Sequence, residues 1–313
     1  MTRRPRFPGR RTALAALLCA VTAATLTSCA TEGPDRPSVV VTTDILGDIT
    51  REIAGDEAEV TVLMPTGTDP HSFGVSAPQA ARLEQADLVV HNGLGLEENV
   101  QHHVRAAQDD GVPVLAVAPA VDPIDHQGGD GAGQPDPHFW TDPQRVRTAV
   151  TLIADRIAAD VEGVDPGRVR DNAARYGRDI DKLGSEMRTA FGALPAERRQ
   201  LVTDHHVFGY LAQRFGFTVV GAVIPAGSTL ASPSASDLKS LADAIRAADV
   251  PAVFTGAARP DRLARVLRDE TGLSVSVVPL YTESLTGPDG GAPTYLAMMR
   301  ANTRAITAAL TTR

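Results

Sequence analysis

The chain repeats one pattern of strand, helix and strand, and this repeat constrains the fold more than any other feature. Each half contains three segments that end before a proline: a β-branched or apolar run, a stretch with helical apolar spacing, and a second apolar run. In the first half these segments lie at 39–43, 44–54 and 60–63, and in the second half at 201–203, 208–215 and 218–224. The two copies have one length, because Thr43 to Pro65 and Thr203 to Pro225 both span 22 positions. The sequence therefore predicts two related lobes.

Each half continues in the same way, with two further pairs of helix and strand. The clearest of these are helices at 76–85 and 234–247 and strands at 88–90, 112–117, 252–254 and 275–280. Strands that alternate with helices favour parallel sheets covered on both faces. We therefore predict an α/β protein of two similar lobes, each a roughly four-stranded parallel sheet flanked by helices, related by duplication.

A mostly helical stretch separates the two lobes. Asp142-Pro143 and Asp165-Pro166 each place a proline in the first turn of a helix, where it is favoured. The second helix runs to about Phe191, and at ~1.5 Å per residue it would span a small domain. We expect it to be a rigid connector. The predicted organisation is an N-terminal lobe at 38–164, the connector at 165–193 and a C-terminal lobe at 194–313.

The N-terminus has the layout of a secretory signal. Five arginines and no acidic residue occur in the first 11 positions, and an apolar run at 13–26 is too short to span a membrane. The run ends in Leu26-Thr27-Ser28-Cys29, which resembles a bacterial lipobox. We expect a signal peptide at 1–28, lipidation of Cys29 and a tether at 29–37, with a standard signal peptide and a chance cysteine as the alternative. The export route, general secretory or twin-arginine, stays open.

Cleavage before Cys29 would change what the composition implies. The full chain has 313 residues and a net charge of −8, whereas the mature chain would have 285 residues, 25 basic against 38 acidic, and a charge of −13. Such an acidic chain argues against a nucleic-acid partner. Cys19 would be lost and Cys29 acylated, so the mature chain would offer no thiol for a disulfide, a nucleophile or a thiolate metal site.

Four metal-competent side chains follow the ends of predicted strands. His71 and His138 come after strands of the first lobe, and His205 and Glu283 after strands of the second. Ligands of open α/β sheets bind outside these carboxyl ends, so a cation between the lobes would draw on two side chains from each. Three imidazoles and one carboxylate suit Zn²⁺ in a tetrahedron at ~2.0–2.1 Å.

Five segments resemble the metal-binding solute receptors of zinc and manganese ABC transporters, the cluster A-I substrate-binding lipoproteins. They lie in family order over nearly the whole mature chain: Asp69-Pro70-His71-Ser72-Phe73, Asn92-Gly93-Leu94-Gly95-Leu96-Glu97, Asp136-Pro137-His138-Phe139-Trp140-Thr141-Asp142-Pro143, His205-His206-Val207-Phe208-Gly209-Tyr210 and Tyr281-Thr282-Glu283-Ser284-Leu285.

The resemblance implies that His71, His138, His205 and Glu283 are the metal ligands. Glu283 stands where the family usually has Asp, which leaves its denticity open. His206 also replaces a usual Asp, so it remains an alternative to His205. A histidine at the third position is associated with zinc and a glutamate with manganese, in agreement with the preference of nitrogen ligands for zinc.

The function implied is an extracytoplasmic receptor that delivers Zn²⁺ to an ABC permease and its ATPase. It would be a monomer, lipid-anchored to the outer face of the cytoplasmic membrane, and a metallochaperone could supply the ion. Many zinc members have a histidine-rich loop for metal capture, and His126 is a reduced version of it or part of an ordinary loop. The connector helix implies limited closure.

Alternative functions are a manganese or iron receptor of the same family, a metal-dependent adhesin and a metallohydrolase. The sequence lacks both a His-Glu-x-x-His motif and a nucleophile elbow. A site closed by four protein ligands also leaves no position for an activated water. We therefore expect a binding protein and not an enzyme.

Overall fold

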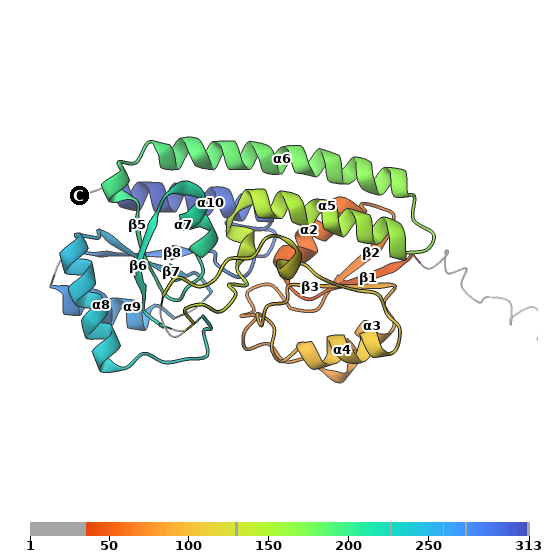
Figure 1. Ribbon diagram of the computed structural model, residues 1–313, viewed down its shortest axis with the longest axis horizontal. Coiled ribbons are helices and arrows are strands. Elements are labelled where there is room, and N and C mark those ends of the chain that lie inside the picture. Colours follow the sequence, from red (N-terminus) through yellow and green to blue (C-terminus); the bar gives the residue numbers. More distant parts are fainter. Residues whose placement is uncertain (1–35, 129–130, 226, 259, 273, 312–313) are drawn as a thin grey trace, which may run out of the picture. The chain divides into compact units, whose positions relative to one another are not determined.

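Eight short strands form two parallel sheets in the computed structural model, which describes residues 36–128, 131–225, 227–258, 260–272 and 274–311 (Figure 1). The first sheet has the order β2-β1-β3-β4 and the second the order β6-β5-β7-β8. The strands are β1 (Ser38–Val41), β2 (Glu59–Val62), β3 (Leu88–His91), β4 (Val114–Ala116), β5 (Gln200–Thr203), β6 (Thr218–Ala222), β7 (Ala252–Gly256) and β8 (Ser276–Leu280). This shared order confirms the predicted fold class of two similar α/β lobes.

The helices begin where capping side chains and prolines allow it. Thr43 accepts a hydrogen bond from the Leu46 amide, and Asp142 and Asp165 do the same for amides of the next two long helices. The helices are α2 (Asp44–Ala54), α3 (Ala77–Glu84), α4 (Gln101–Asp109), α5 (Pro143–Asp160), α6 (Pro166–Gly192), α7 (Gly209–Phe215), α8 (Ala235–Ala248), α9 (Arg262–Thr271) and α10 (Tyr295–Thr311), with short 3-10 turns η1 (Ala118–Ala120), η2 (Phe139–Thr141) and η3 (Ala196–Arg198).

One hydrophobic core runs beneath both sheets. Side chains alternate between the faces of a strand, so Val39 and Val41 enter this core whereas Val40 faces α3 and α4. In the second sheet Leu201 enters it, and Val202 faces α8 and α9. Each sheet thus has a smaller core of its own on one face and shares the main core on the other.

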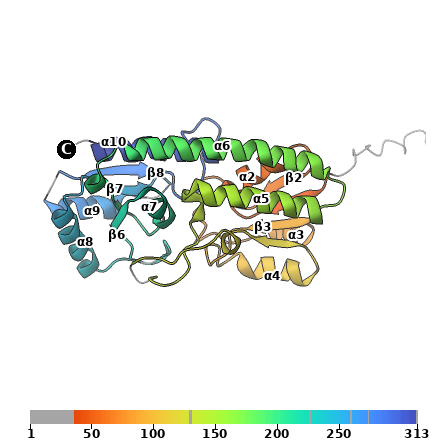
Figure 2. The ribbon, with the colours of Figure 1, turned by 45° about the horizontal axis from the view of Figure 1, so that its top comes forward.

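Two helices extend this shared core across the molecule. The connector α6 packs against α2, α5, α7 and α10, with a buried stripe that recurs every three or four residues (Figures 1 and 2). The final helix α10 is absent from the sequence prediction. It packs on α6 and α2, and the Tyr295 hydroxyl donates to the Trp140 carbonyl at 2.8 Å. The C-terminal helix therefore packs against elements of the first lobe, although it follows the second lobe in the sequence.

Residues 37–313 form one compact unit, so the lobe boundaries at 164 and 193 stay predictions. The predicted signal peptide, Cys29 and nearly all of the tether lie outside the described residues. Among the helices of the described ranges, none is long and apolar enough to cross a bilayer.

The two repeats differ in the connection between their first strand and first helix. Thr43 caps α2 directly after β1, whereas a loop of five residues at 204–208 separates Thr203 from α7. Helix α7 has 7 residues and α2 has 11, so the loop replaces the first helical turn within the same 22-position interval. This exchange creates the loop that places His205.

Candidate metal site

The structure brings the four predicted ligands together. One nitrogen from each of His71, His138 and His205 and one oxygen of Glu283 all lie within 4.8 Å of one another. All four residues are buried, and both His138 and His205 have 0% exposure. Residues separated by up to 212 positions in the chain thus converge at one point, as predicted from the ends of the strands.

The distances between these atoms suit a small tetrahedral ion. Oε1 of Glu283 lies 2.8 Å from Nε2 of His71, 3.2 Å from that of His205 and 3.6 Å from that of His138. Bonds of ~2.0–2.1 Å in a tetrahedron would separate neighbouring ligand atoms by about 3.3–3.4 Å. A single oxygen of Glu283 faces all three imidazoles, so the longer side chain reaches the centre of the cluster.

Two of these nitrogens make no aligned hydrogen bond, although Oε1 of Glu283 lies 2.8 Å from Nε2 of His71 and 3.6 Å from Nε2 of His138. Within the described residues, Nε2 of His71 and Nε2 of His138 are buried and no donor or acceptor is aligned with either of them. A buried polar atom without a partner is costly and rare in folded proteins. A cation at this point would give both lone pairs a partner, so the residues fit a metal.

Two carboxylates orient the imidazoles. Asp136 lies 2.7 Å from Nδ1 of His138, and Asp204 lies 3.0 Å from Nδ1 of His205. Each contact leaves Nε2 directed at the cluster, which is how carboxylates fix metal-binding histidines in other proteins. Our sequence analysis did not assign these two residues. A pattern in the sequence could have indicated them, because an Asp precedes each of the three predicted ligand histidines by one or two positions. These residues, Asp69, Asp136 and Asp204, each accept the backbone amide of the histidine that follows.

The electrostatics of the metal-free cluster are those of an ion pair. Burial lowers the pKa of His205, but the charges of Glu283 and Asp204 and its hydrogen bonds to both outweigh this and raise the pKa to about 10. Burial raises the pKa of Glu283, but the charge of His205 and contacts from the three imidazoles hold it well below its usual range. At neutral pH the imidazole of His205 is therefore protonated, and a metal ion would have to displace that proton.

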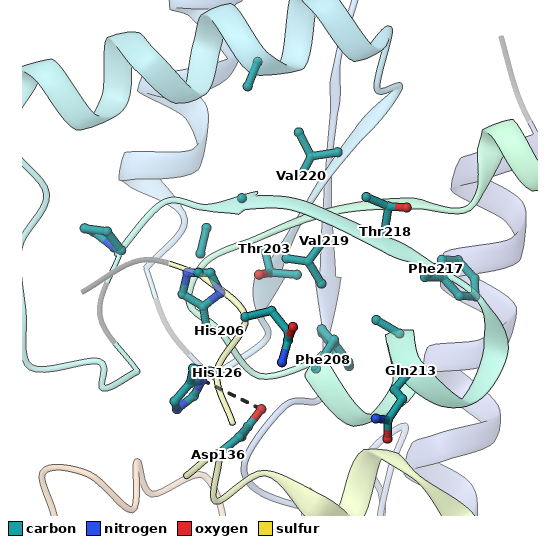
Figure 3. Close-up of a pocket in the computed structure, with 18 of the residues that line it drawn as sticks. His126, Asp136, Thr203, His206, Phe208, Gln213, Phe217, Thr218, Val219 and Val220 are labelled. Carbon is teal, nitrogen blue, oxygen red and sulfur yellow. Dashed lines mark ion pairs between the residues drawn. The ribbon is translucent and has the colours of Figure 1, made fainter. Parts of the chain in front are cut away.

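His206 lies outside this cluster and lines a neighbouring pocket. The pocket has a volume of about 800 Å³ and lies between the loop around His126, helix α7 and strand β6 (Figure 3). The rings of His126 and His206 have centroids 6.3 Å apart, and Nδ1 of His126 lies 3.8 Å from Asp136. Burial, followed by the charges of neighbouring imidazoles, lowers the pKa of His206 to about 4, so the ring is neutral.

His126, Asp136 and His138 also form a group of potential ligands, with one atom from each within 4.8 Å of the others. Figure 3 shows His126 and His206 on one wall of the pocket and Asp136 beside His126. Because Asp136 also contacts His138, this pocket and the four-residue cluster share a wall. The structure thus places His126 close to the predicted site but outside its four ligands.

Comparison with protein families gives one match over most of the chain. The sequence model described as "Zinc-uptake complex component A periplasmic" (ZnuA) matches residues 39–309. "Zinc-binding protein TroA" of Treponema pallidum is 31% identical over 282 residues, which are 88% of this chain and 89% of the relative. "Iron-binding protein YfeA" of Yersinia pestis is 30% identical over 295 residues, 91% and 92% of the two chains.

Solved structures agree with this match. The periplasmic zinc-binding protein TroA of Treponema pallidum has a TM-score of 0.80 at 29% identity, with 88% of this chain and 99% of that chain covered. A manganese-bound periplasmic metal-binding protein of Candidatus Liberibacter asiaticus has a TM-score of 0.78 at 29% identity, with 88% and 100% covered. The names of these relatives include different metals.

Proposed function

Since the chain belongs to the family of the periplasmic component A of zinc-uptake complexes, we propose that it is the receptor that binds Zn²⁺ outside the cytoplasm and delivers it to an ABC permease and its ATPase. Its relatives include receptors named for zinc, manganese and iron. The family shares a general function, that of a metal-binding substrate receptor of an ABC transporter. The choice of zinc is our proposal.

One observation supports zinc most directly: three buried imidazole nitrogens and one carboxylate oxygen all lie within 4.8 Å of one another, with the oxygen 2.8, 3.2 and 3.6 Å from the three nitrogens. Imidazole suits zinc, whereas manganese prefers more oxygen ligands and a larger coordination number. His205 and not His206 faces the cluster, which supports the assignment of His205 as the third ligand. Four protein ligands would fill a tetrahedral ion, and this favours a receptor over a hydrolase.

In vitro affinity alone does not separate the zinc and manganese proposals, because most nitrogen and oxygen sites bind Zn²⁺ more tightly than Mn²⁺. The decisive experiment is therefore growth of a deletion strain complemented with the full chain. We expect rescue under zinc restriction and no rescue under manganese or iron restriction, with His71→Ala as the inactive control. Rescue only under manganese restriction, or tighter binding of Mn²⁺ than Zn²⁺ by purified residues 30–313, would overturn the choice of zinc.

We assign an accessory role to His126 at the pocket beside the site. Its side chain is 5% exposed and lies near His206 and Asp136, where a zinc ion could pause before it reaches His138. His126→Ala should slow zinc association at low ion concentration and leave the equilibrium affinity of the main site within about threefold, since it removes no ligand of that site. An unchanged association rate would make 122–136 an ordinary loop.

Membrane attachment through Cys29 is the remaining part of the proposal. Relatives such as the manganese-binding PsaA of Streptococcus anginosus are named as lipoproteins. Cys29→Ser should shift the protein from the membrane fraction to the medium or periplasm without changing its zinc affinity. A protein that stays in the membrane fraction after this substitution would contradict the anchor.

A further inference from the structure

Glu283 follows β8 of the second sheet, yet residues on both sides of it are hydrogen-bonded to first-lobe elements. On one side, the indole nitrogen of Trp140 donates to the Thr282 carbonyl at 2.8 Å. On the other side, the Leu285 amide donates to Oδ2 of Asp44 at 2.9 Å. The backbone of the carboxylate ligand is therefore held from two directions by residues of η2 and α2.

The hydroxyl of Ser284 strengthens this attachment. It donates to the same Oδ2 atom of Asp44 and accepts the backbone amide of Gly67 at 2.6 Å. Gly67 lies in the loop that leads to His71, so one hydroxyl joins the loops of two predicted ligands. We call Asp44, Ser284 and the amides of Gly67 and Leu285 the Asp44 clamp.

The carboxylate of Asp44 and the hydroxyl of Ser284 lie in the desolvated part of the clamp, whereas Gly67 is exposed. Asp44 and Ser284 are each 8% exposed, and Trp140 is 3% exposed. Hydrogen bonds to a carboxylate are stronger than neutral ones, and exclusion of water strengthens them further. Breaking this cluster would leave buried donors without an acceptor, so the loop around Glu283 has one favoured position relative to α2.

His205 is held in a different way. Its ring contacts Asp204, whose second oxygen accepts the Gly256 amide at 2.9 Å, at the end of β7. Asp204 follows Thr203 as Asp44 follows Thr43, so the two aspartates occupy equivalent positions of the repeat. Asp204 orients His205, which belongs to the same lobe. Asp44 belongs to the first lobe but is bonded to the loop of Glu283, which belongs to the second.

We infer that Asp44 is the positioning residue for the carboxylate ligand, and that it fixes Glu283 in register with His71 and His138. Through the clamp, Glu283 is held by first-lobe residues, although its position in the sequence assigns it to the second lobe. The imidazole of His205 is then the one predicted ligand whose orientation depends on β7 of the second sheet. This inference rests on the proposed metal site.

The experiment compares variants of purified residues 30–313 by Zn²⁺ competition titration and by the visible spectrum of bound Co²⁺. Asp44→Ala should weaken Zn²⁺ binding by roughly 10–100-fold and change the Co²⁺ spectrum, as loss of residues that orient ligands does elsewhere. Asp44→Asn keeps an acceptor oxygen and should stay within about threefold of the wild type. Asp48→Ala is the matched control, because Asp48 on the same helix accepts the Tyr295 amide and no amide of the clamp.

A double-mutant cycle separates positioning from a general structural role. Combined with Glu283→Gln, Asp44→Ala should add less than about threefold, because the clamp then has no anionic ligand to position. An equal loss in both backgrounds, or no loss in the wild-type background, would overturn the inference alone. If Asp44→Ala does not fold, Ser284→Ala removes the hydroxyl that joins Asp44 to the Gly67 amide but leaves the Leu285 amide on Asp44, and it enters the same cycle. A wild-type protein that binds neither Zn²⁺ nor Co²⁺ would overturn the proposed metal site as well.

Discussion

The ligand side chains owe their geometry to aspartates that do not belong to the predicted ligand set. Asp136 and Asp204 direct two imidazoles, and Asp44 fixes the loop of Glu283. In each case a short carboxylate, buried at Asp44 and Asp136 and partly buried at Asp204, accepts donors from a predicted ligand or from its neighbours, so hydrogen bonds within the protein itself hold the arrangement. Such preorganisation lowers the cost of binding.

We first predict that the adjacent histidines behave differently. His205→Ala should weaken Zn²⁺ binding by at least roughly 100-fold, more than the loss of an orienting residue, because it removes a ligand. His206→Ala should change the affinity less than about threefold, since its ring faces the neighbouring pocket. Competition titration with a chromophoric chelator measures both. The reverse order of effects would show that His206 is the third ligand.

The raised pKa of His205 predicts that binding releases a proton. The pKa of His205 in the empty site is about 10, so at pH 7.5 the ring is protonated and a metal ion must displace that proton. The affinity for Zn²⁺ should therefore fall about tenfold for each unit that the pH decreases below this pKa, and more steeply where further imidazoles titrate. Calorimetry at pH 7.5 in buffers of different ionisation enthalpy would measure the protons released, and a value of zero would contradict the ion pair.

At the scale of elements, the periodicity of the apolar residues and the residues that cap the helices explain most of the predicted helices and strands. The valine-rich strands and the Asp-Pro helix starts lie within a few residues of the expected positions. Helix α10 was missed, although its buried residues Tyr295, Met298, Asn302 and Ile306 have helical spacing. Polar Asn302 on the buried face concealed this pattern, and it is polar because it hydrogen-bonds the backbone of Tyr281.

Contacts between elements that are distant in the chain could not be predicted from the sequence. Asp44 and Ser284 are separated by 240 positions, and neither spacing nor composition joins them. The convergence of the four predicted ligands was predictable because parallel strands end at one edge and because the motifs resemble a family. Their supporting residues were not, because that role depends on the rotamer of a ring and on the path of a loop.

Helix α2 offers a test of stability that is independent of metal. Burial, partly offset by the Tyr295 amide, raises the pKa of Asp48 from 3.8 to about 6. The native state thus binds a proton that the unfolded state releases between these values, so the contribution of Asp48 to stability is full below pH 3.8 and is lost as the pH rises through 6. Asp48→Asn should stabilise the metal-free protein by about 1–2 kcal/mol at pH 7.5 and by less at pH 5.

Urea unfolding in EDTA at the two pH values would measure this difference. Asp56→Asn is the control, since that side chain is exposed just after the same helix and does not contribute to the pKa shift of Asp48. Equal effects of Asp48→Asn at pH 5 and pH 7.5 would show that the substitution acts through packing or the hydrogen bond and not through ionisation.

At the scale of the whole described molecule, the shared core limits how the lobes can separate. Helix α6 and helix α10 both pack on elements of the first lobe, and the side chains beneath the two sheets form one cluster. Close-packed interiors resist continuous deformation, so opening of a wide cleft would have to break this cluster. Metal release therefore requires local rearrangement around the ligand loops.

This architecture predicts a small change of shape with metal. The radius of gyration of residues 30–313 from small-angle scattering should agree within error between the metal-free and Zn²⁺-loaded forms. The melting temperature should nevertheless rise, because at 1,000 times the dissociation constant a ligand adds about 4.1 kcal/mol of stability. A clear compaction on binding would show that the lobes rotate as separate bodies, contrary to the shared core.

Helix α10 has a consequence for the order in which the chain can fold. It contains the last described residues, yet its first residue, Tyr295, is hydrogen-bonded to Asp48 in α2 and to Trp140 in η2. These contacts close loops of more than 150 residues, and such long-range contacts form late and slow the overall reaction. The packing of the N-terminal half is therefore completed only after α10 has been synthesised or exported, and before then this half exposes an apolar surface that chaperones could recognise.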